Sequence, residues 1–300
     1  ASGSYVRGNE GGFKGAFQVG NAGEFAQPSA AQLTLLNWGS EASAASFTNS
    51  LSGNGVVALQ NSFVQIDDEL AFEGTWDLGS STDKDRLVVE TDSKSLPKDG
   101  VKVGDSVKLG NEDELVFRTT NGLPAGAVKI TTNVEGSGSF IVESGRYEVA
   151  NGTSVQVAET DVVSGASLTV SSLNQLGSTV TADGTIVVNA GSNVVLGDKV
   201  LKTTEGADGA RTLQINAGER GVLTIGDKLD YTGFEGQIRL ASGTYTYADK
   251  DEALWSNVGF AVGGSGSFVY AGADQIQLKA FSWDYLSDKG NGVLNIDGYA

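Results

Sequence analysis

A short phrase recurs in this chain at a nearly constant interval. Residues 186–191 read Ile-Val-Val-Asn-Ala-Gly, and residues 213–218 read Leu-Gln-Ile-Asn-Ala-Gly. A second phrase follows each copy: Leu-Gly-Asp-Lys-Val at 196–200 and Ile-Gly-Asp-Lys-Leu at 225–229. Short β-type runs that end in turns and return after about 27 to 29 residues predict a coiling chain, in which each rung lies on the one before.

Elsewhere the apolar residues alternate with polar ones, as in strands that bury one face. The alternation is clearest at 139–143, 146–149, 154–157 and 167–170. Asn-Gly and Asp-Gly pairs lie between such runs, and they suit either antiparallel hairpins or the corners of one rung. The nearly constant interval, with strands of about 4 to 6 residues, favours corners. We therefore predict an all-β protein, a parallel β-solenoid with about three short strands per rung.

The sequence predicts one continuous domain over residues 1–300, because related phrases occur near its start, middle and end. Residues 80–120 carry many charges and repeat poorly, so we expect a less regular segment there, an insertion or a lateral hairpin. Aromatic residues crowd the last third; we expect those in 245–300 to stack in the core and form a cap, with a glycan-stacking or self-association surface as the alternative. Helical spacing is scarce, and its best candidates are Ser40–Leu51 and Asp249–Trp255.

The amino-acid composition excludes several functional classes. The chain has no Cys and no His, which excludes thiolate metal sites and Ser-His-Asp or Cys-His catalysis. A net charge of −17 repels phosphate backbones and anionic membrane surfaces, so we expect no nucleic-acid partner. No apolar run approaches about 18 residues, so we expect no membrane insertion. The chain begins at Ala1 without Met, which suits a mature end after signal-peptide removal or a trimmed boundary.

Carboxylates are the remaining candidates for chemistry. The acidic clusters are Asp67, Asp68 and Glu69, and Glu112, Asp113 and Glu114. Neighbouring residues on a strand point to opposite faces, so each triplet converges on an ion only if it lies in a turn. We therefore interpret both clusters as solvated surface, with a weak Ca²⁺ site as the alternative. Among 37 acidic residues the sequence singles out no catalytic pair, so we predict no enzyme, no catalytic residue and no cofactor.

One stretch resembles a known family. Residues 231–245, Tyr-Thr-Gly-Phe-Glu-Gly-Gln-Ile-Arg-Leu-Ala-Ser-Gly-Thr-Tyr, resemble the passenger-associated repeat of bacterial autotransporters, and the Asn-Ala-Gly phrases at 189–191 and 216–218 resemble its turns. The resemblance covers about 130–290 and 12–25. It implies a right-handed parallel β-helix displayed outside the cell. Such passengers precede a C-terminal membrane barrel, which this sequence lacks, so we expect a separated passenger or a relative that assembles by another route.

These observations favour an exported, non-enzymatic structural or adhesive protein of the cell surface that associates with itself into a fibre or layer. The strand-like ends are the candidates for strand addition between copies. The residues concerned are Tyr5, Val6, Val293, Leu294 and Ile296. The alternatives are a monomeric adhesin passenger that binds a glycan or host surface and, from another class, a Ca²⁺-assisted β-helix enzyme that acts on polysaccharides.

Overall fold

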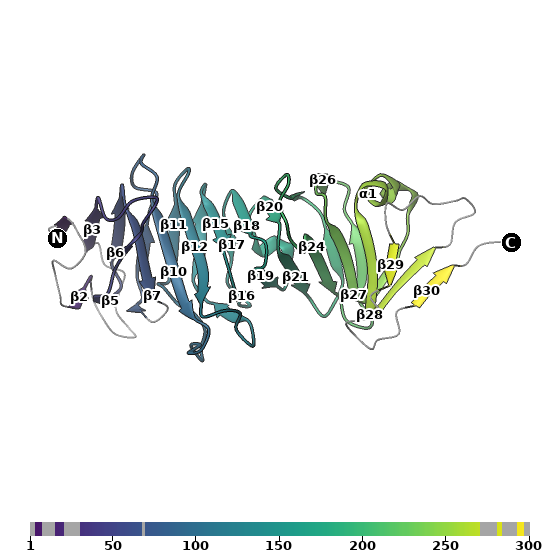
Figure 1. The fold of residues 1–300 in the computed structure, drawn as a ribbon, viewed down its shortest axis with the longest axis horizontal. Helices are drawn as coiled ribbons and strands as arrows, with labels where there is room; N and C mark the ends of the chain where they lie inside the picture. The colour runs from purple at the N-terminus through teal and green to yellow at the C-terminus, as the bar shows by residue number, and fades with distance from the viewer. Residues whose placement is uncertain are drawn as a thin grey trace. The chain divides into compact units, whose positions relative to one another are not determined.

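The computed structural model describes residues 4–7, 16–20, 31–67, 70–270, 281–283 and 293–296 (Figure 1). The protein is all-β, and its strand pairings are parallel, which confirms the predicted parallel β-solenoid. The chain divides into two compact units, residues 1–161 and 162–300, and each is described by itself. The single continuous domain therefore stays a prediction. The helices of the described part are short, and none is long and apolar enough to cross a membrane.

Unit 1 winds its chain around three sheets. The first contains, in order, β1 (Ser4–Arg7), β3 (Gln32–Leu36), β6 (Val56–Gln60), β9 (Thr75–Asp77), β11 (Ser106–Leu109), β14 (Asn133–Gly136) and β17 (Val155–Gln156). The second contains β4 (Ala45–Ser46), β7 (Phe63–Asp67), β10 (Arg86–Asp92), β12 (Glu114–Thr120) and β15 (Ser139–Val142). The third side holds β2 (Ala16–Gln18), β5 (Ser50–Gly53) and β8 (Ala71–Phe72), and further along β13 (Val128–Ile130) and β16 (Arg146–Val149). Successive strands such as β11, β12 and β13 therefore make one three-sided rung, as predicted.

The core of unit 1 is a stack of inward side chains, one layer per rung. Leu87 lies in register with Leu115, and both are fully buried. The ring of Phe117 packs against Phe140 and Tyr147, with ring centroids 5.5 and 5.4 Å apart. Each such side chain contributes roughly 1.5–3 kcal/mol to the stability of the fold by leaving water. The alternation of inward apolar and outward polar residues along each strand therefore stabilises the coil.

Residues 80–120 are more regular than the sequence suggested. They contain β10, β11 and β12, which pair in parallel with their neighbours. The irregular part is the connection between β10 and β11, residues 93–105, where Val101 makes an isolated bridge to Ile130. Many of the charges that obscured the repeat, such as Lys84, Lys94 and Glu112, lie in the turns and the connection between these strands.

Unit 2 has the same three-sided arrangement. One side stacks β19 (Ser167–Val170), β21 (Thr185–Asn189), β24 (Thr212–Asn216), β27 (Gln237–Thr246) and β28 (Gly259–Tyr270). The next stacks β22 (Val194–Leu196) and β25 (Val222–Ile225) on the second half of β27. The other stacks β20 (Thr179–Ala182), β23 (Val200–Lys202) and β26 (Asp230–Gly233). In addition, β29 (Phe281–Trp283) and β30 (Val293–Ile296) pair with β28, while β18 (Glu159–Val162) lies where the units meet in sequence.

The repeated phrases lie directly on one another in unit 2. Ile186 is in register with Leu213, and Leu196 with Ile225, so the interval between the phrases is the length of a rung. The Asn-Ala-Gly turns stack as well, and Gly191 has a φ of +62°. A Cβ on Gly218 would lie 2.9 Å from the Gly191 carbonyl oxygen, so the turn needs glycine for both conformation and space.

An aromatic cluster fills the core near β27 and β28. Tyr245, Trp255, Phe260 and Phe268 are buried, and their ring centroids lie between 4.5 and 5.7 Å apart. The Trp255 Nε1–H donates to the Tyr245 hydroxyl at 2.7 Å, and this hydroxyl lies 2.8 Å from Asp251 Oδ2. The predicted stacking of these aromatics is therefore present, but the cap over 245–300 stays a prediction because much of that range lies outside the described residues.

The two predicted helices have different outcomes. A turn of 3₁₀-helix (Asp249–Asp251) leads into α1 (Glu252–Asn257), close to the range expected. The helix expected over Ser40–Leu51 is wrong, because this segment contains β4 and the start of β5. Ala45 and Phe47 are both buried, so this part of the segment follows the strand period of two, and the alanines at 42, 44 and 45 misled the helical interpretation.

Candidate functional site

The first predicted acidic cluster lies at the end of β7. Asp67 is exposed there, whereas Asp68 and Glu69 lie outside the described residues. Within the described part of the chain, no group of three or more His, Cys, Asp or Glu side chains is placed to hold a metal ion. The weak Ca²⁺ site stays a prediction.

The second predicted cluster separates into three environments. Glu112 is exposed in a turn, where its φ is +72°. Asp113 is buried and accepts hydrogen bonds from backbone N–H groups. The Glu114 carboxylate binds Lys84 at 2.9 Å and forms a second ion pair with Arg86. Glu112 and Asp113 precede β12 and only Glu114 lies on it, so the three carboxylates do not converge, and the solvated surface predicted for this cluster is wrong for the buried Asp113.

A buried polar ladder joins four rungs of unit 1 at the corner before the second sheet. The Trp38 N–H donates to Ser62 Oγ at 3.1 Å, and the Ser62 N–H donates to Asp85 Oδ1 at 2.6 Å. The Asp85 N–H in turn donates to Asp113 Oδ1 at 2.9 Å, while the Gly110 N–H donates to Asp113 Oδ2 at 2.7 Å. Ser62, Asp85 and Asp113, which we call the polar ladder, are almost completely buried.

Burial changes the acidity of the polar ladder. It raises the pKa of Asp85 to about 6, although hydrogen bonds from Ser62 and Ser81 act in the opposite direction. Burial also raises the pKa of Asp113. A shifted carboxyl group can mark a catalytic site, but both oxygens of each carboxyl already accept hydrogen bonds from the protein. We therefore interpret the ladder as structural. Its oxygen atoms accept hydrogen bonds from backbone N–H groups at a corner of the rung, where strand pairing provides no partner.

Ion pairs cross the outside of the second sheet just beside this ladder. Lys84 binds Glu41 at 2.8 Å, and this hydrogen bond, with a second to Glu114, raises the lysine's pKa. Arg118 binds Glu90 at 2.9 Å and Gln65 at 2.7 Å. We call this surface the charged face; its members are Glu41, Gln65, Lys84, Arg86, Glu90, Glu114 and Arg118.

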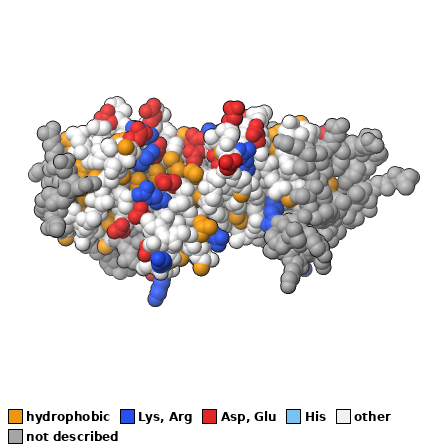
Figure 2. Space-filling view, viewed as in Figure 1, with side chains coloured by type: hydrophobic (Ala, Val, Ile, Leu, Met, Phe, Trp, Pro, Cys, Tyr) orange, Lys and Arg blue, Asp and Glu red, His pale blue; other side chains and the backbone are white. Residues whose placement is uncertain are grey.

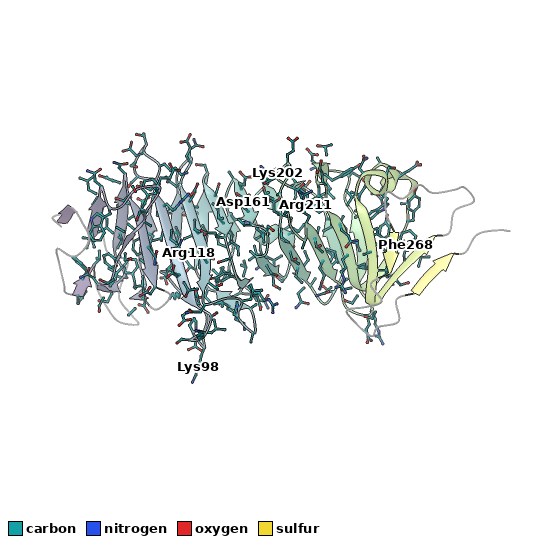
Figure 3. The ribbon with its side chains drawn as sticks, viewed as in Figure 1. Lys98, Arg118, Asp161, Lys202, Arg211 and Phe268 are labelled. Carbon is teal, nitrogen blue, oxygen red and sulfur yellow. The ribbon has the colours of Figure 1, made fainter. Side chains whose placement is uncertain are left out.

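The charged face covers apolar side chains. Val88 and Val116 lie on outward positions in β10 and β12, yet they are only 2 and 3% exposed. In Figure 2, blue and red side chains lie beside orange ones in the part of the view where Figure 1 has these strands, and Figure 3 labels Arg118 among them. The long stems of Arg and Lys lie over such positions while their charged ends stay in water.

Unit 2 has an outer surface of a different kind on β19, β21, β24 and the first half of β27. Its outward side chains are hydroxyls, amides and a valine, stacked in register. We call this surface the neutral face; its members are Ser167, Thr169, Thr185, Val187, Asn189, Thr212, Gln214, Asn216, Gln237 and Arg239. Arg239 is the only charged member, and its Nη1 donates to Gln214 Oε1 at 2.6 Å. Gln214 Nε2 continues the network to Asn216 Oδ1 at 3.2 Å.

The neighbouring side of unit 2 exposes apolar area. Val195 in β22 is 63% exposed, and Val222 in β25 is 41% exposed. Val195 is in register with Thr224, and Val222 with Thr244, so short β-branched side chains continue across these rungs. These positions of β22, β25 and β27 carry no long side chain that could cover the valines, in contrast to the surroundings of Val88 on the charged face.

The predicted self-association residues lie on strands at the ends of the sheets. Tyr5 and Val6 are in β1, which begins the first sheet and pairs with β3. Val293, Leu294 and Ile296 are in β30, which pairs with β28. In the described part of the chain each of these strands has a paired neighbour on one side, so the backbone arrangement is compatible with strand addition.

Two of these features were not recognised in the sequence. The polar ladder could have been found from its position, since Ser62, Asp85 and Asp113 each come immediately before a strand. Their residue types and intervals differ, which hid the pattern. The neutral face could not have been found without the register, because Ser and Thr are common throughout the chain.

Comparisons with known proteins identify no relative: no family model, no curated protein and no solved structure matches this chain.

Proposed function

We propose that this chain is a non-enzymatic structural protein of the bacterial cell exterior, and that it associates with copies of itself through the neutral face. The observation that carries the proposal is a broad surface with a single charge on a chain of net charge −17. Copies of such a chain repel one another over most of their surface. The repulsion is smallest where two neutral faces meet.

The chemistry of the neutral face suits a contact between copies. Most of its side chains are Ser, Thr, Asn or Val and are stacked in register, so little conformational freedom is lost at these positions when the surface is covered. Ser, Thr, Asn and Gln provide both donors and acceptors, so hydrogen bonds can form across the contact. The exposed Val195 and Val222 on the adjoining side add apolar area.

Export is supported by the resemblance of residues 231–245 to the passenger-associated repeat, whose family is displayed outside the cell. A surface protein that assembles into a fibre or layer needs a regular scaffold and a surface of low repulsion. Strand addition through β1 and β30 is a second route to the same assembly, since both strands lie at sheet ends. The two routes use different residues and are separable by mutation.

Sedimentation velocity and negative-stain microscopy test the proposal. We expect the wild-type chain to associate at micromolar concentration, as dimers where two neutral faces meet and as longer polymers where strand addition joins the dimers, and we expect the double variant Val187→Glu/Gln214→Glu to lose the dimers. The matched control is Gln65→Glu/Thr120→Glu, which changes the net charge equally but lies on the second sheet of unit 1. Equal loss of assembly in both double variants would refute a specific role for the neutral face. Deletion of residues 1–8 tests the strand-addition route separately.

A monomeric adhesin is the second candidate, and the amides of the neutral face favour it. Asn189, Gln214 and Asn216 present donors and acceptors that could bind glycan hydroxyl groups. A wild-type chain that stays monomeric yet binds a glycan array, with binding lost in Val187→Glu/Gln214→Glu, would support this candidate over assembly. The Ca²⁺-assisted enzyme stays a prediction, tested by polysaccharide cleavage with and without a chelator.

A further inference from the structure

One side of unit 2 carries short outward side chains in two straight columns. The strands on this side are β22, β25 and the second halves of β27 and β28, and their pairing is parallel. Leu223, Tyr245 and Phe268, which Figure 3 labels, are almost completely buried. The residues before and after each of them therefore point outward, because successive residues of a strand face opposite ways.

The backbone register arranges these outward residues in columns across the rungs, and we call this surface the paired columns. The members of the first column are Val222, Thr244 and Ser267. The members of the second, two residues further along β25, β27 and β28, are Val195, Thr224, Thr246 and Val269. All of them are exposed or half-buried, so the surface is open to solvent over four consecutive rungs.

The paired columns form a regular lattice of fixed groups. Neighbouring members of one column are about 4.8 Å apart, which is the spacing of paired strands, and the columns are about 7 Å apart, which is two residues of a strand. Every member except Ser267 is β-branched, so the rotation of its side chain is restricted. The backbone ladder thus holds methyl and hydroxyl groups at repeated positions.

No member of the paired columns is charged, although the chain has a net charge of −17. The charges that flank β25, at Glu219, Arg220, Asp227 and Lys228, lie in turns and not on the strand. The charged face of unit 1 has the same rung spacing, but long lysine and arginine side chains extend from it. The paired columns therefore present a lattice that no long side chain interrupts.

This chemistry restricts the kind of partner. Protein interfaces depend on aromatic and arginine anchors, and the paired columns contain neither. They measure about 15 Å by 7 Å between the outermost members, which is far below the roughly 800 Å² that each partner buries in a stable protein interface. There is no cation for a phosphate group and no aromatic ring on which a sugar ring stacks. A flat and periodic partner fits these properties better.

We propose that the paired columns bind the surface of ice. The hydroxyl groups of Thr224, Thr244 and Thr246 hold water molecules at positions set by the lattice, and the methyl groups between them offer those waters no competing partner. Oxygen atoms on a prism face of ice repeat at distances close to both spacings of the columns. Water held on this surface therefore joins the crystal at a small further cost in entropy, as in other preorganised contacts. The inference does not rest on the proposed self-association.

Incorporation into slowly growing ice tests this proposal. The full chain is labelled with a fluorophore and frozen slowly from dilute solution, beside a labelled acidic protein of similar size that ice excludes. We expect the wild-type chain to enter the ice, whereas the reference protein stays in the liquid. A second readout is thermal hysteresis, the gap between the melting and growth temperatures of a single crystal, which should appear together with faceted crystal growth.

Two variants disrupt the lattice without touching the core. In Thr224→Lys/Thr246→Lys the charged groups must leave liquid water at the crystal surface, so at least about tenfold more protein should be needed for the same hysteresis. Ser267→Tyr raises a bulky ring above the lattice without adding charge, and should have the same effect. Circular dichroism and urea midpoints verify that both variants fold.

The matched control is Thr185→Lys/Thr212→Lys. It makes the same substitutions at two outward positions one rung apart on the neutral face, and it should bind ice as the wild type does. The double variant Val187→Glu/Gln214→Glu, designed to lose the dimers, should also bind ice. A failure of the proposed self-association therefore leaves this test intact.

The proposal is overturned if ice excludes the wild-type chain, if either column variant acts like the wild type, or if the control loses as much activity as the column variants. Loss of ice binding in Val187→Glu/Gln214→Glu alone would assign it to the neutral face and overturn the proposal too. If ice excludes the wild type and Thr224→Lys/Thr246→Lys dissociates its dimers, the paired columns contact a second copy instead.

Discussion

The charged face of β10 and β12 and the neutral face of β21 and β24 use the same rung geometry for different purposes. Arg86 lies in register with Glu114, and Thr185 with Thr212, so one rung separates the members of each pair. Behind both faces the inward side chains are fully buried, as at Leu115. The two faces thus differ only in what points outward, and the comparison separates what folds the coil from what a partner would meet.

The two faces differ in whether charged side chains cover their outward apolar residues. On the charged face Arg and Lys stems cover Val88 and Val116, and the ion pairs at their ends satisfy one another. On the neutral face Val187 is partly exposed, and on the adjoining side, where the outward side chains are short, Val195 is largely exposed. A surface whose apolar side chains are covered gives a partner little apolar area to bury, whereas a surface with exposed apolar side chains gives more. This contrast underlies the proposed function.

The largest effect is expected where the charged face joins the polar ladder. Asp113→Ala removes the acceptor of two backbone N–H groups, the buried one of Asp85 and the partly buried one of Gly110. We expect a loss of about 2–5 kcal/mol in the free energy of unfolding, measured by urea denaturation. Hydrogen exchange should localise the loss to residues 80–120. The control Asp113→Asn keeps an acceptor oxygen, and an equally large loss in both variants would contradict a hydrogen-bonding role.

The pH dependence of unit 1 should reveal Asp85. Burial raises its pKa from an ordinary value of 3.8 to about 6 in the folded chain, so between these pH values the folded state retains a proton that the unfolded state has released. The contribution of Asp85 to the free energy of unfolding is therefore fully present below about pH 4. It is lost as the pH rises through 6, and the loss amounts to about 1–3 kcal/mol. Asp85→Asn should remove this component from the pH profile of unfolding. Identical profile shapes for variant and wild type would disprove it.

A smaller effect should distinguish the arginines of the two faces. Arg118→Ala uncovers outward valines and breaks the ion pair with Glu90, so we expect a loss of about 1 kcal/mol that shrinks partly with added salt. Arg239→Ala breaks the hydrogen bond to Gln214 on a face where the outward valine is not buried beneath charged side chains. We expect the free energy of unfolding to fall by less than about 0.5 kcal/mol. Urea midpoints at two salt concentrations measure both. Equal losses would remove the distinction between the faces.

The smallest effect tests whether charge alone keeps copies apart. Val187→Thr adds no charge to the neutral face and retains a β-branched side chain, so stability should change by less than about 0.5 kcal/mol. Assembly should persist, whereas Val187→Glu/Gln214→Glu abolishes it. Loss of polymers in Val187→Thr would mean that apolar contact, and not the absence of charge, holds the copies together.

Much of the fold was predictable, because inward positions repeat. The phrases at 186–191 and 213–218 lie on one another as predicted, and the three-strand rung follows from the turn spacing. The expected helix over Ser40–Leu51 failed because alanine suits a helix as well as a rung corner. The candidate surfaces were largely unpredictable. The neutral face and the charged face depend on which residues from different rungs lie together, and the unequal lengths of successive rungs on one side conceal that register.

The amino-acid sequence by itself determined the coil: alternation buries one side of every strand, and glycine turns allow each rung to lie on the previous one. It also determined the acidity of the chain and the absence of histidine and cysteine chemistry. Only the tertiary structure decided which outward side chains share a face. Residues one rung apart become neighbours solely through backbone pairing between rungs, and that pairing assembles Arg86 with Glu114 and Thr185 with Thr212.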